Sequence, residues 1–260
     1  MSSDVSLYVL YRIANATIQP FPFPHIFVRE VFPPEFYRRL REQLPPKESL
    51  TTLRALRRVK AGYPETRLVL PLTRKDLEAV AEPLRSFWGE LAEWMLRGGL
   101  GEVMLSKFGD YLTQRFGDVR GRQFQDEAML VQDYTTYALG PHTDDPRKVL
   151  SFLFYLPADD TRSHLGTSIY IPKDRKFTCA GGPYHAFELF QRVCTMPYVA
   201  NSLFAFLKTP YSFHGVEPIT ETEVRRDLLL YDIKVQAPPE IDQHAPAAPV
   251  ETAVPSKFSF

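Results

Sequence analysis

The spacing of hydrophobic residues separates a helix-forming first part of the chain from a strand-forming second part. Up to about residue 116, apolar residues recur every three or four positions, the period of a helix that buries one face. Prolines and glycines mark the boundaries, because proline is tolerated in the first turn of a helix and glycine favours its end. An early strand, Ile26–Phe32, precedes the helices. The predicted helices are Glu35–Leu44, a short helix capped by Thr73, a stretch from Leu84 to Gly98, and Gly101–Phe116.

After Gly121 the pattern changes to short apolar runs between turn residues, which is typical of an antiparallel β-sandwich. The predicted strands are Ala128–Tyr134, Lys148–Tyr155, Thr167–Ile171, Ala186–Val193, Ser202–Phe206 and Val224–Val235. The sequence therefore predicts an α+β fold with a mainly β core and helices packed outside it. We expect one domain over residues 1–237, helix-rich in 1–122 and β in 123–237. The remainder, 238–260, is rich in Ala and Pro and is expected to be a loosely ordered tail.

Candidate chemistry lies in the β part of the chain. His142 and Asp144 are two residues apart, so on an extended backbone both side chains project to the same side. His214 follows 72 residues later (214 − 142), far enough for several strands to bring it back. Two imidazoles and one carboxylate form the ligand set that holds non-heme Fe(II) and leaves other positions open. A His-x-Asp pair also occurs by chance, and in the alternative interpretation His142 caps a turn and His214 lies in a surface loop.

Further segments accompany these residues and carry a family resemblance. In order along the chain they are His142–Asp144, Lys148–Leu156, Gly166–Tyr170, Asn201–Phe206, Ser212–Pro218 and Arg225–Tyr231. Together they resemble the catalytic core of the Fe(II)- and 2-oxoglutarate-dependent dioxygenases, and the prolyl-hydroxylase-like branch most of all. The resemblance covers less than half of the chain. It implies a double-stranded β-helix, a cupin-like jelly-roll of two sheets with iron at its open end.

The resemblance also implies roles for individual residues. His142, Asp144 and His214 would be the iron ligands and therefore the catalytic centre, with 2-oxoglutarate and O₂ as cosubstrates and ascorbate as a further candidate cofactor. An arginine on the strand after His214 would bind the far carboxylate of 2-oxoglutarate, because a guanidinium forms two parallel hydrogen bonds to a carboxylate. Arg225 and Arg226 compete for this role, since neighbours on a strand face opposite ways. The family pattern favours Arg225, and Tyr155 matches a tyrosine near the same carboxylate.

Composition limits the setting in which such an enzyme works. The formal net charge of zero argues against nucleic acid or an anionic membrane as the main partner. Two cysteines are too few for a disulfide framework and fit a reducing compartment. The short apolar run near the N-terminus is interrupted by Arg12 and lacks the features of a signal peptide. We therefore expect a cytoplasmic protein without a membrane span.

Three functions remain open from the sequence. The first is hydroxylation of a C–H bond in a small molecule, which we favour because the helical region is large enough to cover the site. The second is hydroxylation of a protein side chain on the same fold. The third is a non-catalytic β-sandwich that binds a metal or small ligand. The oligomeric state and the primary substrate have no signal in the sequence.

Overall fold

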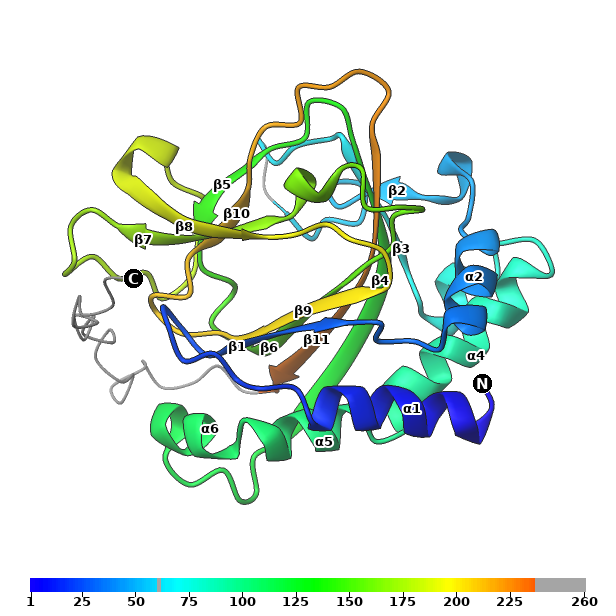
Figure 1. Cartoon of the computed structure of the whole chain (residues 1–260), viewed down its shortest axis with the longest axis horizontal. Helices are drawn as coiled ribbons and strands as arrows, with labels where there is room; N and C mark the ends of the chain where they lie inside the picture. The colour runs from blue at the N-terminus through cyan, green and yellow to red at the C-terminus, as the bar shows by residue number, and fades with distance from the viewer. Residues whose placement is uncertain (60–61, 237–260) are drawn as a thin grey trace, which may run out of the picture.

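The computed structural model describes residues 1–59 and 62–236, and six α-helices and eleven strands lie in this part (Figure 1). The helices are α1 Ser3–Ala14, α2 Pro34–Glu42, α3 Arg74–Leu77, α4 Leu84–Arg97, α5 Leu100–Lys107 and α6 Gly109–Phe116. The strands are β1 His25–Arg29, β2 Thr51–Thr52, β3 Arg67–Pro71, β4 Phe124–Tyr134, β5 Leu139–His142, β6 Lys148–Tyr155, β7 Thr167–Pro172, β8 Phe190–Met196, β9 Ser202–Leu207, β10 His214–Val216 and β11 Arg225–Val235.

The strands form two antiparallel sheets. The larger has the order β1-β9-β6-β11-β4-β3-β2, and the smaller has the order β5-β10-β7-β8. Apart from the hairpin of β7 and β8, successive strands of the β part alternate between the sheets: β4, β6, β9 and β11 lie in the large sheet, whereas β5, β7, β8 and β10 lie in the small one. This alternation wraps the chain around a common interior, which is the double-stranded β-helix that the sequence predicts. The predicted fold class is thus confirmed.

Two hydrophobic cores lie on opposite faces of the large sheet. One fills the space between the sheets and includes Tyr155, Ile169 and Phe206. The other lies between the large sheet and the helices and includes Trp88, Phe154 and Tyr231. Figure 1 shows α1, α5 and α6 along the outer side of this sheet, with the small sheet on its other side. The helices therefore cover the back of the large sheet and not the space between the sheets, contrary to the expectation that they cover the site.

Most predicted elements are present, with three differences. The predicted helix Gly101–Phe116 is two helices, because the backbone leaves the helical conformation at Phe108, next to the poor helix former Gly109. The strand predicted at Ala186–Val193 begins later, at Phe190, after a 3₁₀ turn over Phe187–Leu189. The early strand ends at Arg29 instead of Phe32, because Glu30 has a positive φ of 50°.

Several elements were not predicted. Helix α1 has only two buried residues, Val9 and Ile13, so its helical period is weak. Strands β5 and β10 are too short to show an alternation of four or more residues. The predicted tail, 238–260, lies outside the described residues, and the domain limits stay a prediction. Among the described helices, none is long and apolar enough to cross a membrane.

Candidate metal centre and charged interior

The small sheet brings His142 and His214 side by side. β5 ends at His142, β10 begins at His214, and the two residues are direct partners in the antiparallel pairing. Opposite residues of such a pair share one face, and the centroids of the two imidazole rings are 4.4 Å apart. Asp144 follows two residues after His142, with its Oδ1 4.0 Å from His214 Nε2. One ligand atom from each of the three residues lies within 4.8 Å of the others, so this group can hold a metal ion.

Glycines allow the two histidine strands to approach closely. A Cβ at position 215, next to His214, would lie 2.5 Å from the carbonyl oxygen of Leu139 on β5. A Cβ at position 140 would lie 2.3 Å from the carbonyl oxygen of His185. Both distances are far below van der Waals contact, so a larger residue at either position would push β5 and β10 apart or displace the segment around His185. Gly215 therefore helps to set the separation of the two imidazoles, and Gly140 allows the segment around His185 to pack against β5.

The protonation of the three groups suits a cation. His142 Nδ1 lies 3.0 Å from the Gly140 carbonyl, and His214 Nδ1 lies 3.0 Å from the Ser212 carbonyl. A carbonyl only accepts hydrogen bonds, so each Nδ1 carries the proton and each Nε2 presents its lone pair. Burial lowers the pKa of His142 to about 3 and lowers that of His214 as well. Both rings are therefore neutral at pH 7, as metal binding requires.

The Asp144 carboxylate is held on both oxygens. Ser151 Oγ donates a hydrogen bond of 2.7 Å to Oδ2, and Lys148 Nζ lies 3.3 Å from Oδ1. Lys148 is shared with Asp232, whose Oδ2 lies 3.0 Å from the ammonium. Burial by itself raises the pKa of Asp144, but Lys148 and the two imidazoles hold it well below its ordinary value. The carboxylate is thus ionised, with Oδ1 on the side of the histidines.

Helix α6 secures the turn that carries Asp144. Arg115 is buried on this helix and donates hydrogen bonds to the carbonyls of Lys148, at 2.8 Å, and Pro146, at 2.9 Å. The turn also closes on itself through a 2.9 Å bond from Lys148 N to the Asp145 carbonyl. The turn that follows His142 and carries Asp144 is therefore held in place by a residue of helix α6.

A second charged cluster lies at the other end of the interior. Arg226, on β11, is completely buried, and its Nη1 donates a 2.6 Å bond to Asp133 on β4. Arg67, on β3, binds the same carboxylate through two bonds of 2.6 and 2.8 Å. Arg226 also donates to the Leu165 carbonyl at 2.6 Å and to Thr167 Oγ1 at 3.2 Å. Within the described part of the chain these contacts engage three of the five N–H donors of the guanidinium, and the Tyr155 hydroxyl lies close to it as well, so at most two donors are left for another acceptor.

The two candidate arginines face opposite ways, as expected for neighbours on a strand. The Arg225 side chain is 42% exposed and pairs with Asp227 on the outside of the sheet, at 3.1 Å. The side chain of Arg226 lies between the sheets, where its guanidinium is 5.6 Å from the Tyr155 ring centroid. Tyr155 is fully buried there, and its hydroxyl accepts a 3.2 Å bond from the backbone N–H of Thr167. The structure therefore groups Tyr155 with Arg226 and not with Arg225, whereas the role of Arg225 as the carboxylate anchor stays a prediction.

Strand β7 relates the two clusters. Thr167 contacts Arg226, and Ile169, two residues further on, is the pairing partner of His214. Two residues span about 7 Å along a strand. A short linear ligand can therefore reach from the metal ligands to the guanidinium along this strand.

Sequence reasoning missed several residues of the site: Ser151, Lys148, Asp232, Arg115, Arg67 and Asp133. Some of these had a usable signal. Ser151 is a polar residue inside the apolar run Lys148–Tyr155, and Asp232 is an acid inside Arg225–Val235, so each marks a polar position on a buried strand. Arg115 and Arg67 had none, because their partners come from distant segments.

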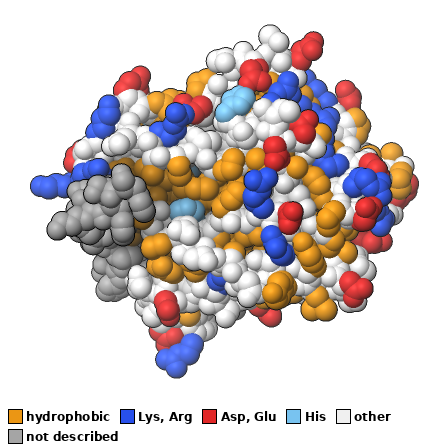
Figure 2. All heavy atoms as spheres, in the orientation of Figure 1, with side chains coloured by type: hydrophobic (Ala, Val, Ile, Leu, Met, Phe, Trp, Pro, Cys, Tyr) orange, Lys and Arg blue, Asp and Glu red, His pale blue; other side chains and the backbone are white. Residues whose placement is uncertain are grey.

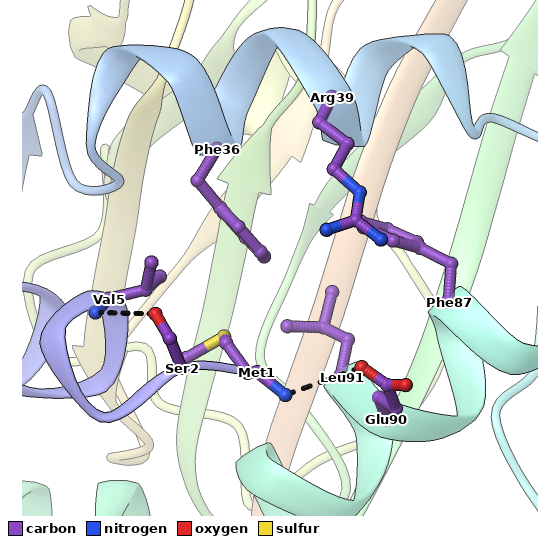
Figure 3. Close-up of a pocket in the computed structure, with 8 residues that line it drawn as sticks. All are labelled: Met1, Ser2, Val5, Phe36, Arg39, Phe87, Glu90 and Leu91. Atoms are coloured by element: carbon purple, nitrogen blue, oxygen red, sulfur yellow. Dashed lines mark hydrogen bonds and ion pairs between the residues drawn. The ribbon is translucent and has the colours of Figure 1, made fainter.

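A cavity of about 290 Å³ lies elsewhere, among α1, α2 and α4 (Figure 3). Phe36, Phe87 and Leu91 point into it, and none of the three metal-ligand candidates lines it. It belongs to the helical side of the large sheet and is separate from the space between the sheets.

Solved structures with a similar arrangement of the chain include several oxygenases. A prolyl-4-hydroxylase from Pseudomonas putida has 14% sequence identity and a TM-score of 0.49, over 88% of this chain and 99% of that one. The carbocyclase SnoK from nogalamycin biosynthesis, described as non-heme and α-ketoglutarate-dependent, has 14% identity and a TM-score of 0.48, over 96% and 94%. HygX from Streptomyces hygroscopicus, with nickel and 2-oxoglutarate bound, has 13% identity and a TM-score of 0.44, over 90% and 87%. No protein-family model matches the sequence, and a comparison with curated proteins found no match.

Proposed function

We propose that this protein is an Fe(II)- and 2-oxoglutarate-dependent dioxygenase that hydroxylates a C–H bond of a small molecule. The observation that carries the proposal is the convergence of His142, Asp144 and His214 at the end of β5 and β10. Two neutral imidazoles and one ionised carboxylate are the donor set of an open Fe(II) site, whereas structural zinc sites are commonly closed by four ligands that include cysteine. The two cysteines, Cys179 and Cys194, are free and are not part of the group.

The residues present fit such a metal. Each histidine offers Nε2 while Nδ1 is committed to a carbonyl, and Asp144 offers Oδ1 while Oδ2 is committed to Ser151. Bound there, iron with 2-oxoglutarate and O₂ supplies the oxidation: substrate, 2-oxoglutarate and O₂ yield hydroxylated substrate, succinate and CO₂. The contribution of the chain is to hold the ligand atoms in place and to limit the access of water.

Arg226 is the residue that we propose to bind the far carboxylate of 2-oxoglutarate, in place of Arg225. Two arginines and one aspartate make up its cluster, so the cluster carries a net charge of +1 (Arg67 and Arg226, +2; Asp133, −1). Arg226 has donors to spare, and the Tyr155 hydroxyl, which accepts from Thr167, still has its own proton to donate. The span of about 7 Å along β7 suits a five-carbon dicarboxylate that chelates the metal at one end.

A small molecule fits the metal centre better than a segment of another protein. The side chains of Asp144 and His214 are only 12% and 9% exposed. The segment between β7 and β8 is fixed beside the ligand turn by bonds from Thr143 Oγ1 to the Cys179 carbonyl, at 2.8 Å, and from Lys208 Nζ to the Ala180 carbonyl, at 2.7 Å. Access to the metal ligands is therefore narrow, although the enclosure comes from this segment and not from the helices.

The test is the formation of succinate from 2-oxoglutarate by purified protein with Fe(II) in air. We expect slow succinate release without primary substrate, abolished by a chelator and by Asp144→Ala. Asp145→Ala is the matched control, because Asp145 is the next residue but bonds to Arg147 on the surface, and this variant should keep its activity. Equal succinate release by the wild type and Asp144→Ala would contradict the proposal. Stoichiometric iron binding without any consumption of 2-oxoglutarate would instead favour the non-catalytic alternative.

A further inference from the structure

One row of residues crosses the inner face of the large sheet opposite the metal ligands. The pairing registers place His25 of β1 next to Phe206 of β9, Phe206 next to Ser151 of β6, and Ser151 next to Asp232 of β11. Directly paired residues share a face, so all four side chains project between the sheets. The row meets the metal centre twice: Ser151 donates to Asp144, and the Phe206 ring centroid is 4.5 Å from that of His214. His25 is the member of the row that the proposed function does not use.

His25 is built like the two metal-ligand histidines but lies outside their group. It is only 5% exposed, and its Nδ1 lies 2.9 Å from the carbonyl of Phe23, two residues earlier. The same relation holds His142 and His214. Because the carbonyl can only accept, Nδ1 carries the proton and Nε2 is an acceptor. Among the described residues, no hydrogen bond to Nε2 is found, and Nε2 is not one of the fully buried atoms that lack a partner, so it is accessible to the donor of a ligand or of water.

The surroundings of His25 are aromatic. Its ring centroid is 5.8 Å from that of Phe23 and 5.9 Å from that of Phe204, and Phe23 in turn is 5.7 Å from Phe206. Burial lowers the pKa of His25, so the ring is neutral at pH 7 and does not attract an anion. These rings favour a flat, uncharged partner with one polar group.

The molecular surface near His25 also favours an uncharged, apolar partner. In the orientation of Figure 1, hydrophobic side chains form a band across this face of the molecule, between β8 on one side and β1 on the other (Figure 2). Large hydrophobic residues on these two edges are exposed, including Val193 of β8 at 40% and Phe21, just before β1, at 36%. The β1 edge of the interior, where His25 lies, is therefore approached over apolar surface.

We propose that His25 is a substrate-binding residue, which accepts a hydrogen bond at Nε2 from the hydroxyl or N–H group of an aromatic substrate that enters over the apolar surface beside β1. This inference rests on the proposed function, since it places the substrate beside the metal centre. It assigns the primary substrate to a chemical class, neutral aromatic compounds that carry a hydrogen-bond donor. His25 would orient the ring of the substrate and take no part in the oxidation.

The experiment uses phenol and anisole as probes of the full-length protein loaded with Mn²⁺. Both have one aromatic ring and one oxygen, but only phenol donates a hydrogen bond. The readout is the enhancement of proton relaxation that bound Mn²⁺ causes in a probe held near it, measured by NMR over a concentration series. We expect phenol to bind more tightly than anisole by about five- to tenfold, the value of one neutral hydrogen bond. Two variants test the residue: His25→Phe should reduce phenol binding to the level of anisole, and His25→Gln should restore part of the difference through its carbonyl oxygen.

The outcomes separate this inference from the proposed function. Mn²⁺ affinity, measured first, should be the same in the wild type and both variants, because His25 is not a ligand; this also shows that the variants are folded. If phenol binds equally to the wild type and His25→Phe, or does not bind near Mn²⁺ at all, the role of His25 is refuted while succinate formation can still stand. If Mn²⁺ itself does not bind to the wild type, the metal centre, the proposed function and the role of His25 are all refuted.

Discussion

The two ends of the β-helix interior hold buried charges of opposite balance. At the metal end, Asp144 and Asp232 share one ammonium, that of Lys148, and the histidines are neutral; burial raises the pKa of Asp232 and Lys148 opposes this, and with both acids ionised the cluster carries −1 (two carboxylates, −2; Lys148, +1). At the other end, Arg67 and Arg226 share one carboxylate, that of Asp133, so the cluster carries +1. Each end therefore has one charge of its own that no neighbour in the cluster neutralises.

This difference shows how the interior can select a ligand. A buried net charge is unfavourable in a low-dielectric environment unless a partner of opposite sign is present. The metal end suits a cation and the other end suits an anion, and β7 connects them over about 7 Å. A metal ion together with a short dicarboxylate satisfies both ends at once. A ligand without the second acid group would leave the guanidinium end uncompensated.

The largest effect is expected when the guanidinium of Arg226 is removed from the positively charged cluster. Arg226→Met should raise the concentration of 2-oxoglutarate needed for half-maximal succinate formation by about 100-fold, because a charge-assisted pair of hydrogen bonds is lost from a buried site. Mn²⁺ affinity should stay unchanged, since Arg226 is not at the metal end.

Arg225→Met is the matched control for this prediction. Its side chain is exposed on the opposite face of the same strand, so the half-saturating concentration should change by less than about twofold. A larger effect for Arg225→Met than for Arg226→Met would return the anchoring role to Arg225. Because Asp133 keeps its two bonds from Arg67, the Arg226→Met protein should still fold, which a thermal melt will check.

The metal end should respond to pH in a predictable direction. The pKa of His142 is about 3 in the folded protein and 6.5 ordinarily, so between these values the unfolded chain binds a proton that the folded protein does not. The free energy of unfolding of the metal-free protein should therefore fall as the pH falls below 6.5, by about 1.4 kcal/mol per pH unit for this imidazole.

Urea unfolding at pH 7, 6 and 5 measures this slope, and His142→Asn is the comparison. Both proteins keep His25 and His214, whose pKa values are also lowered by burial, so these contributions cancel. The variant should lose about 1.4 kcal/mol less per pH unit than the wild type. Parallel pH dependences would mean that His142 is not kept neutral by its surroundings.

A smaller effect is expected from the bond that orients Asp144. Ser151→Ala removes the donor to Oδ2 while Lys148 and the charge balance of the cluster remain. A hydrogen bond to a charged group contributes about 1.5–3 kcal/mol, of which part is regained by water, so Mn²⁺ affinity should fall by about tenfold. Titration calorimetry measures the affinity. Ser168→Ala is a suitable control, because Ser168 bonds to Thr195 and not to a metal-ligand candidate; an equal loss in both variants would argue against a specific role for Ser151.

The sequence predicted the three ligand candidates from two kinds of signal: the short spacing of His142 and Asp144, and the residue types around His214 further along the chain. His142 and Asp144 lie within three residues, and the downstream His-Gly-Val and the Arg-Arg pair occur in the order that the family resemblance requires. The longer helices and strands were predicted as well, since the apolar residues of α4 recur at helical spacing and β6 is a nearly continuous apolar run. The choice between Arg225 and Arg226 depends on which face of β11 each side chain occupies, and one residue of shift in register turns a side chain to the other face of a strand.

By itself, the sequence determined the kinds of element, the mainly β core and the residue types available for a metal, because these follow from periodicity and from side-chain chemistry. Only the tertiary structure decided which side chains meet. Lys148 joins Asp144 to Asp232 across two strands, and Asp133 joins Arg67 to Arg226 across three. Such contacts depend on strand order and register, which pair residues up to 181 positions apart (His25 with Phe206, 206 − 25) and leave no mark on the local pattern of the chain.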